Sequence, residues 1–140
     1  MSHPFILCSS DGYEDELIWA AAWLHKATGD NIYLSKAEEM YAKRKQTWPS
    51  WAFSWSDKLP GAQLLLFEIT RDPKYRSDVE IFCDTAMALQ KSPKGQTFRT
   101  RWGSNRYAAN FAFICLGVRI VYIIFFNHIK LFIPGSSCRD

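Results

Sequence analysis

The stretch DGYEDELIWAAAWL, residues 11–24, places several acidic residues directly in front of an apolar segment. Asp11 suits the N-cap of a helix, and Glu14, Asp15 and Glu16 would complement the helix dipole in its first turn. Carboxylates and backbone carbonyls are also the oxygen ligands that calcium prefers, so the same acids are candidate metal ligands. A catalytic pair fits less well, because acid–base hydrolysis needs two carboxyls that face each other across a substrate, and neighbouring side chains on one helical turn diverge.

Tryptophan is the second unusual feature, since the chain has six Trp and an aromatic content of 16%. Trp48, Trp51 and Trp55 crowd into the segment TWPSWAFSW. Tryptophan faces stack on the C–H faces of sugar rings, and loops on a rigid scaffold are common ligand sites. Trp102 and Arg106 are four residues apart at a predicted helix start, so an aromatic platform would lie beside a fork of N–H donors suited to a polyol. Packing of these aromatic side chains against helices is the alternative.

Length and composition limit the class of protein. The 140 residues suffice for one domain, or form a piece of a larger one, and 48% hydrophobic with 22% charged residues argues against disorder. The formal net charge is +3 with no basic stripe, so we expect no nucleic-acid partner. The segment PFILC near the start is too short and lacks the basic residues of a signal peptide.

The four cysteines are widely spaced and form no CxxC pair. Neither a zinc site nor a dense disulfide framework follows from such spacing. We therefore interpret them as buried free thiols, the usual state of isolated cysteines. They are Cys8, Cys83, Cys115 and Cys138.

Helical periodicity dominates the rest of the chain and predicts an all-α fold. The expected helices cover about 13–27, 33–44, 60–69, 73–90 and 104–112. The pattern T-x-D-x-x-Y occurs at Thr28–Tyr33 and again at Thr70–Tyr75, forty-two residues later, each time between two helices. Two helical hairpins of similar length indicate an array of α-hairpins, either an open solenoid or a closed toroid.

Three segments, in this order, resemble the glycoside hydrolase family 9 endoglucanases: DGYEDELIWAAAWLHKATGDNIYL, FSWSDKLPGAQLLL and WGSNRYAANFAF. The resemblance covers about residues 9–117, so we divide the chain into a partial catalytic domain, 1–117, and a non-family hydrophobic tail, 118–140. It implies part of an (α/α)6 toroid, a secreted enzyme, and cellulose-type β-1,4-glucan as the substrate. We expect a monomer if the chain is folded. The implied reaction is inverting hydrolysis, with one carboxylic acid protonating the leaving oxygen and a carboxylate base activating water.

The resemblance also assigns roles to single residues. Trp51 matches a sugar-stacking tryptophan of the family's cleft, and Trp102 and Arg106 match a W-x-x-x-R pair that lines the same cleft. In several members the acidic segment holds a structural calcium ion, which here would involve Asp11, Gly12, Asp15 and Glu16. The family's W-D-D-K motif reads W-S-D-K in this chain, with Ser56 in place of the first aspartate.

No catalytic residue is assigned. The family's base lies in a D-A-G-D type motif that this sequence lacks, and its general acid and paired histidines lie beyond the matched region. We therefore expect a truncated endoglucanase without either catalytic carboxylate. The alternatives are a non-catalytic β-glucan-binding remnant and a helical-repeat interaction module. The tail is β-branched and aromatic with no evident helical face, and its uncharged run Ile120–Phe126 is too short to span a bilayer, so we expect no membrane partner.

Overall fold

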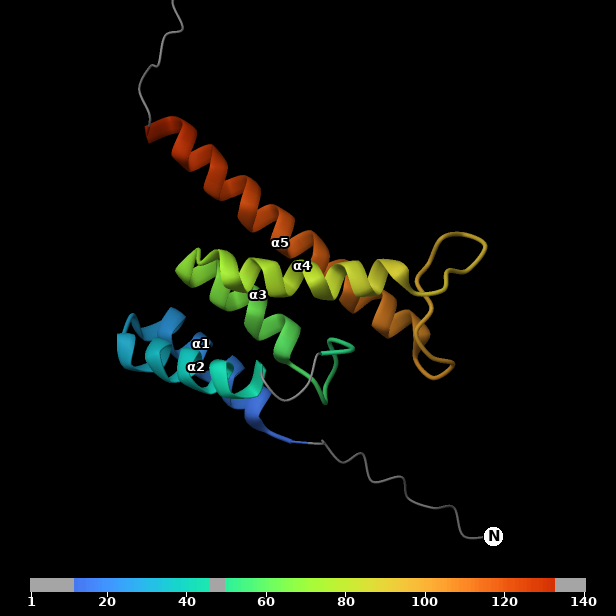
Figure 1. Ribbon diagram of the computed structural model, residues 1–140, viewed down its shortest axis with the longest axis horizontal. Helices are drawn as coiled ribbons and strands as arrows, with labels where there is room; N and C mark the ends of the chain where they lie inside the picture. Colours follow the sequence, from blue (N-terminus) through green and yellow to red (C-terminus); the bar gives the residue numbers. More distant parts are fainter. Residues whose placement is uncertain (1–11, 46–49, 133–140) are drawn as a thin grey trace, which may run out of the picture.

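The computed structural model describes residues 12–45 and 50–132, and this part of the chain is helical (Figure 1). Its helices are α1 (Glu14–Thr28), α2 (Asn31–Lys45), α3 (Leu59–Thr70), α4 (Pro73–Ala88) and α5 (Ser104–Phe132). Pairing of the β type within the described ranges is limited to two isolated bridges, Ser54 with Asp57 and Lys91 with Thr97. The all-α prediction is confirmed.

Helix α3 forms the centre of the molecule. It packs against α1 on one side and against α4 and α5 on the other, while α2 packs on α1 (Figure 1). Most residues of α3 are apolar, and Leu59, Ala62 and Leu66 are almost completely buried. The core continues through Ile18 of α1 and Ile114 of α5, both with no exposed surface. The two hairpins therefore share one core.

The two turns between paired helices use the same hydrogen bonds. In the first, the Thr28 hydroxyl donates to the Leu24 carbonyl and accepts from the Asp30 N–H, and Asp30 Oδ1 accepts from the Ile32 N–H. In the second, Thr70 and Asp72 make the corresponding three bonds. The T-x-D repeat in the sequence is thus a repeated turn structure.

The residue between threonine and aspartate is left-handed in both turns. Gly29 has φ 74° and Arg71 has φ 60°, and their N–H groups donate to the carbonyls of His25 and Phe67. Glycine adopts this conformation without steric cost, whereas a side chain costs roughly 1–2 kcal/mol. Arg71 is held there by contacts with α5, since its guanidinium donates to the Val121 carbonyl at 3.4 Å.

Helix α5 is longer than the sequence indicated. We expected a helix to about residue 112 and a tail without a helical face, but α5 continues to Phe132 as a 29-residue helix. Ile114 and Val118 are buried against the core and Val121 packs on it, which outweighs the modest helix propensity of β-branched residues. Its segment Ser104–Phe125 contains an 18-residue window with a mean hydropathy of 2.0 and is long and apolar enough to cross a bilayer, by length and composition only. The domain boundary at 117 stays a prediction.

A disulfide joins α4 and α5. Cys83 and Cys115 are bonded, with their Cα atoms 5.6 Å apart. Our interpretation of these two residues as free thiols is wrong, because the packing of α4 on α5 brings together residues 32 positions apart in sequence. Cys8 and Cys138 lie outside the described residues.

Candidate functional site

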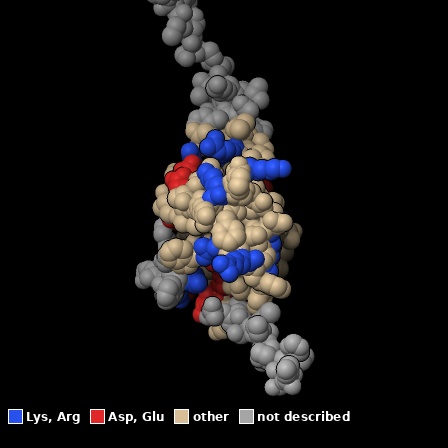
Figure 2. Space-filling model, turned by 90° about the vertical axis from the view of Figure 1, so that its right-hand side faces the viewer, with Lys and Arg blue, Asp and Glu red and all other residues tan. Residues whose placement is uncertain are grey.

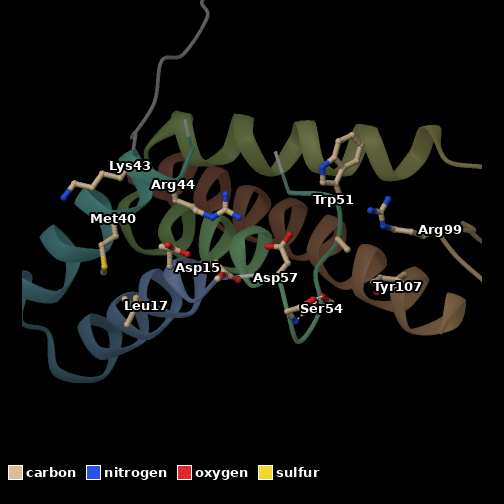
Figure 3. Close-up of a pocket in the computed structure, with 14 residues that line it drawn as sticks. Asp15, Leu17, Met40, Lys43, Arg44, Trp51, Ser54, Asp57, Arg99 and Tyr107 are labelled. Atoms are coloured by element: carbon tan, nitrogen blue, oxygen red, sulfur yellow. Dashed lines mark hydrogen bonds between the residues drawn. The ribbon is translucent and has the colours of Figure 1, made fainter. Parts of the chain in front are cut away.

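An open cleft of about 970 Å³ lies where α1 begins, α2 ends and the tryptophan-rich loop approaches α5 (Figure 3). Trp51, Arg99 and Tyr107 gather at one end of it, and Asp15 and Asp57 lie near its middle. The cleft thus combines an aromatic surface, cationic N–H donors and three carboxylates, those of Glu14, Asp15 and Asp57.

Trp51 presents an open aromatic face to this cleft. Its side chain is 54% exposed, and the Arg99 guanidinium lies 5.9 Å from the ring centroid. The loop that carries it is fixed to the core, because the Phe53 carbonyl accepts a 2.7 Å hydrogen bond from the Asn110 side chain of α5. Phe53 also stacks on Phe113, with ring centroids 6.3 Å apart. An exposed indole on a rigid support suits stacking on a ligand.

Asp15 and Asp57 connect the cleft to the helices. The buried Asp15 carboxylate accepts a hydrogen bond from the Lys58 backbone N–H, which ties α1 to the start of α3. Asp57 accepts from the Ser50 hydroxyl at 2.7 Å and from the Leu59 N–H at 3.1 Å. Burial raises the pKa of Asp57 and the nearby Asp15 adds to the shift, against these hydrogen bonds. Both carboxylates therefore have structural partners.

Glu16 has an incompletely satisfied carboxylate. Its Oε2 atom is buried without a hydrogen-bond partner, and burial, reinforced by the adjacent Asp15, raises its pKa. Gly12 lines the cleft, whereas Asp11 lies outside the described residues. Across residues 12–45 and 50–132, no three His, Cys, Asp or Glu residues are grouped closely enough to hold a metal ion. The helix begins at Glu14 with Tyr13 at its N-cap, so the assignment of Asp11 as the N-cap is wrong.

Trp102 and Arg106 lie in the turn before α5 and in its first turn. Trp102 is 82% exposed and is not among the residues that line the cleft. The Arg106 guanidinium donates to the Tyr107 hydroxyl at 3.1 Å and lies 4.7 Å from its ring centroid. Arg106 is thus connected to the cleft through Tyr107, whereas Trp102 is not part of its lining. Of the other two candidate tryptophans of the loop, Trp55 is exposed and does not line the cleft, and Trp48 is outside the described residues.

Sequence reasoning missed several lining residues, among them Tyr107 and Arg99. Tyr107 falls inside the predicted helix 104–112, and its place beside Arg106 was a signal that it shares that residue's surroundings. Arg99 lies in an irregular segment, and nothing in its local sequence indicated that it would approach Trp51, forty-eight residues earlier.

Comparison with known proteins gives a consistent result. The family model described as glycosyl hydrolase family 9 matches residues 3–127. The chain belongs to this family. Endoglucanase B of Cellulomonas fimi is 40% identical over 120 residues, which cover 77% of this chain and 12% of that protein. Endoglucanase 20 of Arabidopsis thaliana is 47% identical over 110 residues, 69% of this chain and 22% of that protein.

Comparison with solved structures shows that this family 9 chain also resembles endoglucanases in its fold. An endoglucanase from the termite Nasutitermes takasagoensis superposes with a TM-score of 0.78 at 36% identity, over 89% of this chain and 29% of that one. Endoglucanase CelQ from Clostridium thermocellum, solved with cellotetraose, gives 0.73 at 33% identity, over 81% of this chain and 21% of that one. The helices described above are therefore part of an (α/α)6 barrel. The chain spans less than a third of these relatives.

Proposed function

We propose that this chain supplies one wall of the glucan-binding cleft of an endo-β-1,4-glucanase and does not hydrolyse the glucan by itself. The observation that carries the proposal is Trp51, an exposed indole on a fixed loop inside a cleft of about 970 Å³. CelQ, a relative with the same arrangement of helices, binds cellotetraose. The whole family 9 enzyme would be secreted, and the Cys83–Cys115 disulfide supports an oxidising compartment.

Each group in the cleft has a chemical role in this proposal. The face of Trp51 stacks on the apolar face of a glucosyl ring, which keeps the ring's hydroxyls at the edge of the contact. Arg99 donates hydrogen bonds to those hydroxyls, and Tyr107 both donates and accepts. Arg106, bonded to Tyr107, and the exposed Trp102 just before α5 would add further contacts outside the cleft, so that a chain of several glucosyl units is bound rather than a single sugar.

Hydrolysis requires proton transfer, which stacking residues do not provide. An inverting enzyme holds an acid and a base on opposite sides of the bond, roughly 6.5–9.5 Å apart. The cleft carboxylates of Asp15 and Asp57 instead accept backbone N–H groups at the start of α3, and that of Glu14 accepts the Tyr13 N–H at the start of α1. We therefore assign them to positioning the helices, and we assign no catalytic residue in this chain.

Binding to insoluble cellulose and hydrolysis of carboxymethyl-cellulose test the proposal together. We expect the chain to bind cellulose, Trp51→Ala to weaken binding about tenfold or more, and hydrolysis to equal that of a heat-killed control. Trp55→Ala is the matched control, since Trp55 belongs to the same loop, is 46% exposed and does not line the cleft. Absence of binding by the wild type would favour a helical-repeat interaction module, and equal binding by all three proteins would contradict the stacking role of Trp51. Hydrolysis that disappears in Asp15→Asn would make that residue catalytic.

We also propose a structural calcium ion at the start of α1. The unpartnered Glu16 Oε2 beside the Asp15 carboxylate supports it, because a divalent cation satisfies both. Asp11 and the Gly12 carbonyl are the further ligands implied by family resemblance. Millimolar calcium should then raise the melting temperature of the wild type and not of Glu16→Gln. Equal melting temperatures with calcium and with a chelator would leave the acids with structural roles only.

A further inference from the structure

The loop that carries Trp51 is closed on itself by hydrogen bonds. We call residues 50–58 the Trp51 loop. Ser54 and Asp57 exchange backbone hydrogen bonds of 2.9 and 3.4 Å, and the Lys58 ammonium donates to the Ser54 carbonyl at 2.6 Å. A loop bonded in this way is displaced as one piece, so the position of Trp51 depends on where the loop is attached to the helices.

The Phe53 ring attaches the Trp51 loop to the helices. It stacks on Phe113 of α5 with an angle of 12° between the planes, and it contacts Trp19 of α1 at a centroid distance of 6.0 Å. Gly61 of α3 leaves room for these rings, because a Cβ atom at this position would lie 2.7 Å from Phe53 and 2.4 Å from Trp19. Three helices therefore define the position of Phe53, two residues after Trp51.

A side chain of α5 makes the polar part of this attachment. The Asn110 amide donates to the Phe53 carbonyl at 2.7 Å, across 57 positions of sequence. A carbonyl oxygen can only accept, so the amide presents its nitrogen here, and neither an apolar side chain nor a carboxylate could replace it. Asn110 is half-buried, where water competes less for the bond than at an exposed site.

The same face of α5 carries a residue of the cleft. Tyr107 lines the cleft and precedes Asn110 by three residues, so both side chains lie on one face of the helix. One helix thus holds Tyr107 directly and Trp51 through the bond between Asn110 and Phe53. This bond therefore sets how far apart the two cleft residues lie.

We propose that Asn110 is a positioning residue, which holds Trp51 at the place relative to Tyr107 where both can contact one glucan chain. The inference rests on the proposed glucan-binding function. Asn110 does not line the cleft, so it acts through the Trp51 loop and not by touching the sugar. A loop already held in its binding position loses little conformational freedom when a ligand binds, whereas a loosely attached loop has to be ordered, which lowers the affinity.

Hydrogen exchange tests the attachment without a ligand. Asn110→Leu keeps the approximate size of the side chain and removes the donor. Loss of one hydrogen bond of ordinary strength should make the backbone N–H groups of Ser54–Lys58 exchange about fivefold faster, while those of α2 keep their rates. Unchanged exchange in the Trp51 loop would overturn the proposal.

Binding to insoluble cellulose tests the consequence for the cleft. We expect Asn110→Leu to bind about fivefold more weakly than the wild type, with circular dichroism verifying that the variant is folded. In the Trp51→Ala background the same substitution should have no further effect on binding, because the side chain that it positions is absent.

Asn110→Asp tests the donor itself through pH. At pH 7 the carboxylate cannot donate to the Phe53 carbonyl, so this variant should bind as weakly as Asn110→Leu. A protonated carboxyl group can donate, so at about pH 4 its binding should approach that of the wild type measured at the same pH. Equally weak binding at both pH values would overturn the role of the donated bond.

An added carboxylate also changes the local charge, which needs a control. Figure 2 looks at the end of the molecule where α5 begins and shows Lys and Arg among uncharged residues, with the acidic ones mostly toward its margin. Asn105→Asp introduces the same charge in the first turn of α5. The exposed Asn105 side chain accepts a hydrogen bond from Gln96, as an aspartate also can, so this variant should bind like the wild type at both pH values.

Trp51→Ala distinguishes failure of this inference from failure of the glucan-binding function. No binding by the wild type, or undiminished binding by Trp51→Ala, would overturn the glucan-binding function and this inference with it. Weak binding by Trp51→Ala together with normal binding by Asn110→Leu would overturn this inference alone. A further loss of binding when Asn110→Leu is added to Trp51→Ala would also overturn it, since Asn110 would then act on another part of the cleft.

Discussion

At the residue scale, sequence named several of the residues that line the cleft but not the groups that they contact. The acids of the opening stretch and Trp51 were identified from residue type and from family resemblance, and Trp51 does line a cleft. The partner of Asp15 is the backbone of Lys58, forty-three residues away, and no local pattern carries that information. The contact of Arg99 with Trp51 depends in the same way on the packing of an irregular segment.

The raised pKa of Asp57 predicts how its removal depends on pH. Asp57 holds its proton more tightly in the folded chain, so it stabilises the fold below its ordinary pKa of 3.8, and this contribution is lost as pH rises through the folded-state pKa. Asparagine carries no charge and can still accept the Leu59 N–H. We expect Asp57→Asn to be more stable than wild type at pH 7 by about 1 kcal/mol and to lose this advantage near pH 3.

Urea unfolding between pH 3 and pH 8, with a calcium chelator present, measures this difference. Asp72→Asn is the control of opposite sign, because a hydrogen bond from the Lys74 N–H lowers the pKa of that exposed carboxyl. Its ionised form is favoured in the folded chain, so the stability it provides is lost as pH falls. A lower stability of Asp57→Asn than of wild type at pH 7 would show that the Ser50 and Leu59 bonds outweigh the cost of burying the charge.

At the scale of the elements, periodicity predicted four helices to within a few residues and failed for the last. Turn residues marked the ends of α1 and α3, and the T-x-D pattern predicted both turns. The extension of α5 was missed because Ile120–Phe126 has strand-like composition and its helical state depends on packing against α3 and α4. Sequence spacing likewise gave no sign that Cys83 would meet Cys115.

The repeated turn predicts equal effects of equivalent substitutions. Thr28→Val and Thr70→Val keep the side-chain shape but remove the hydroxyl that bonds the preceding helix and the aspartate N–H. We expect each to lower the free energy of unfolding by about 1 kcal/mol, measured by urea unfolding with an unchanged slope. Thr85→Val is the control, since its hydroxyl bonds only the Ile81 carbonyl within α4 and its loss should change stability by less than about 0.5 kcal/mol. If only one of the two variants were less stable than the wild type, the two turns would not contribute equally to stability.

At the scale of the whole molecule, the chain is part of an (α/α)6 barrel with a core of its own. Tyr41 of α2 and Tyr75 of α4 meet edge to face at 5.1 Å, and each donates to a carboxylate on the other's helix, Asp78 and Glu38 respectively. Burial raises the pKa of Tyr75 to about 12, so these hydroxyls stay protonated donors at neutral pH. The hairpin α1–α2 is thus joined to the hairpin α3–α4 by reciprocal polar contacts between α2 and α4 as well as by the packing of α1 on α3.

The disulfide should contribute measurably to the stability of this assembly. Closing a loop of 32 residues reduces the entropy of the unfolded chain by an amount equivalent to about 3–4 kcal/mol. We expect Cys83→Ala/Cys115→Ala to lower the free energy of unfolding by about 3 kcal/mol in urea. Reductant should destabilise the wild type by a similar amount and leave the double variant unchanged. Insensitivity of the wild type to reductant would contradict this.

The same bond makes residues 83–115 a closed covalent ring, and the exposed segment with Lys91, Lys94 and Arg101 lies inside it. A protease that cuts after a basic residue there divides the polypeptide without separating its two parts. The nicked protein would run as one species on a denaturing gel and as two once reductant is added. Because the disulfide keeps α4 and α5 linked across the cut, we expect the nicked protein to keep its fold. A reducing gel would therefore detect the cleavage before any change of shape does.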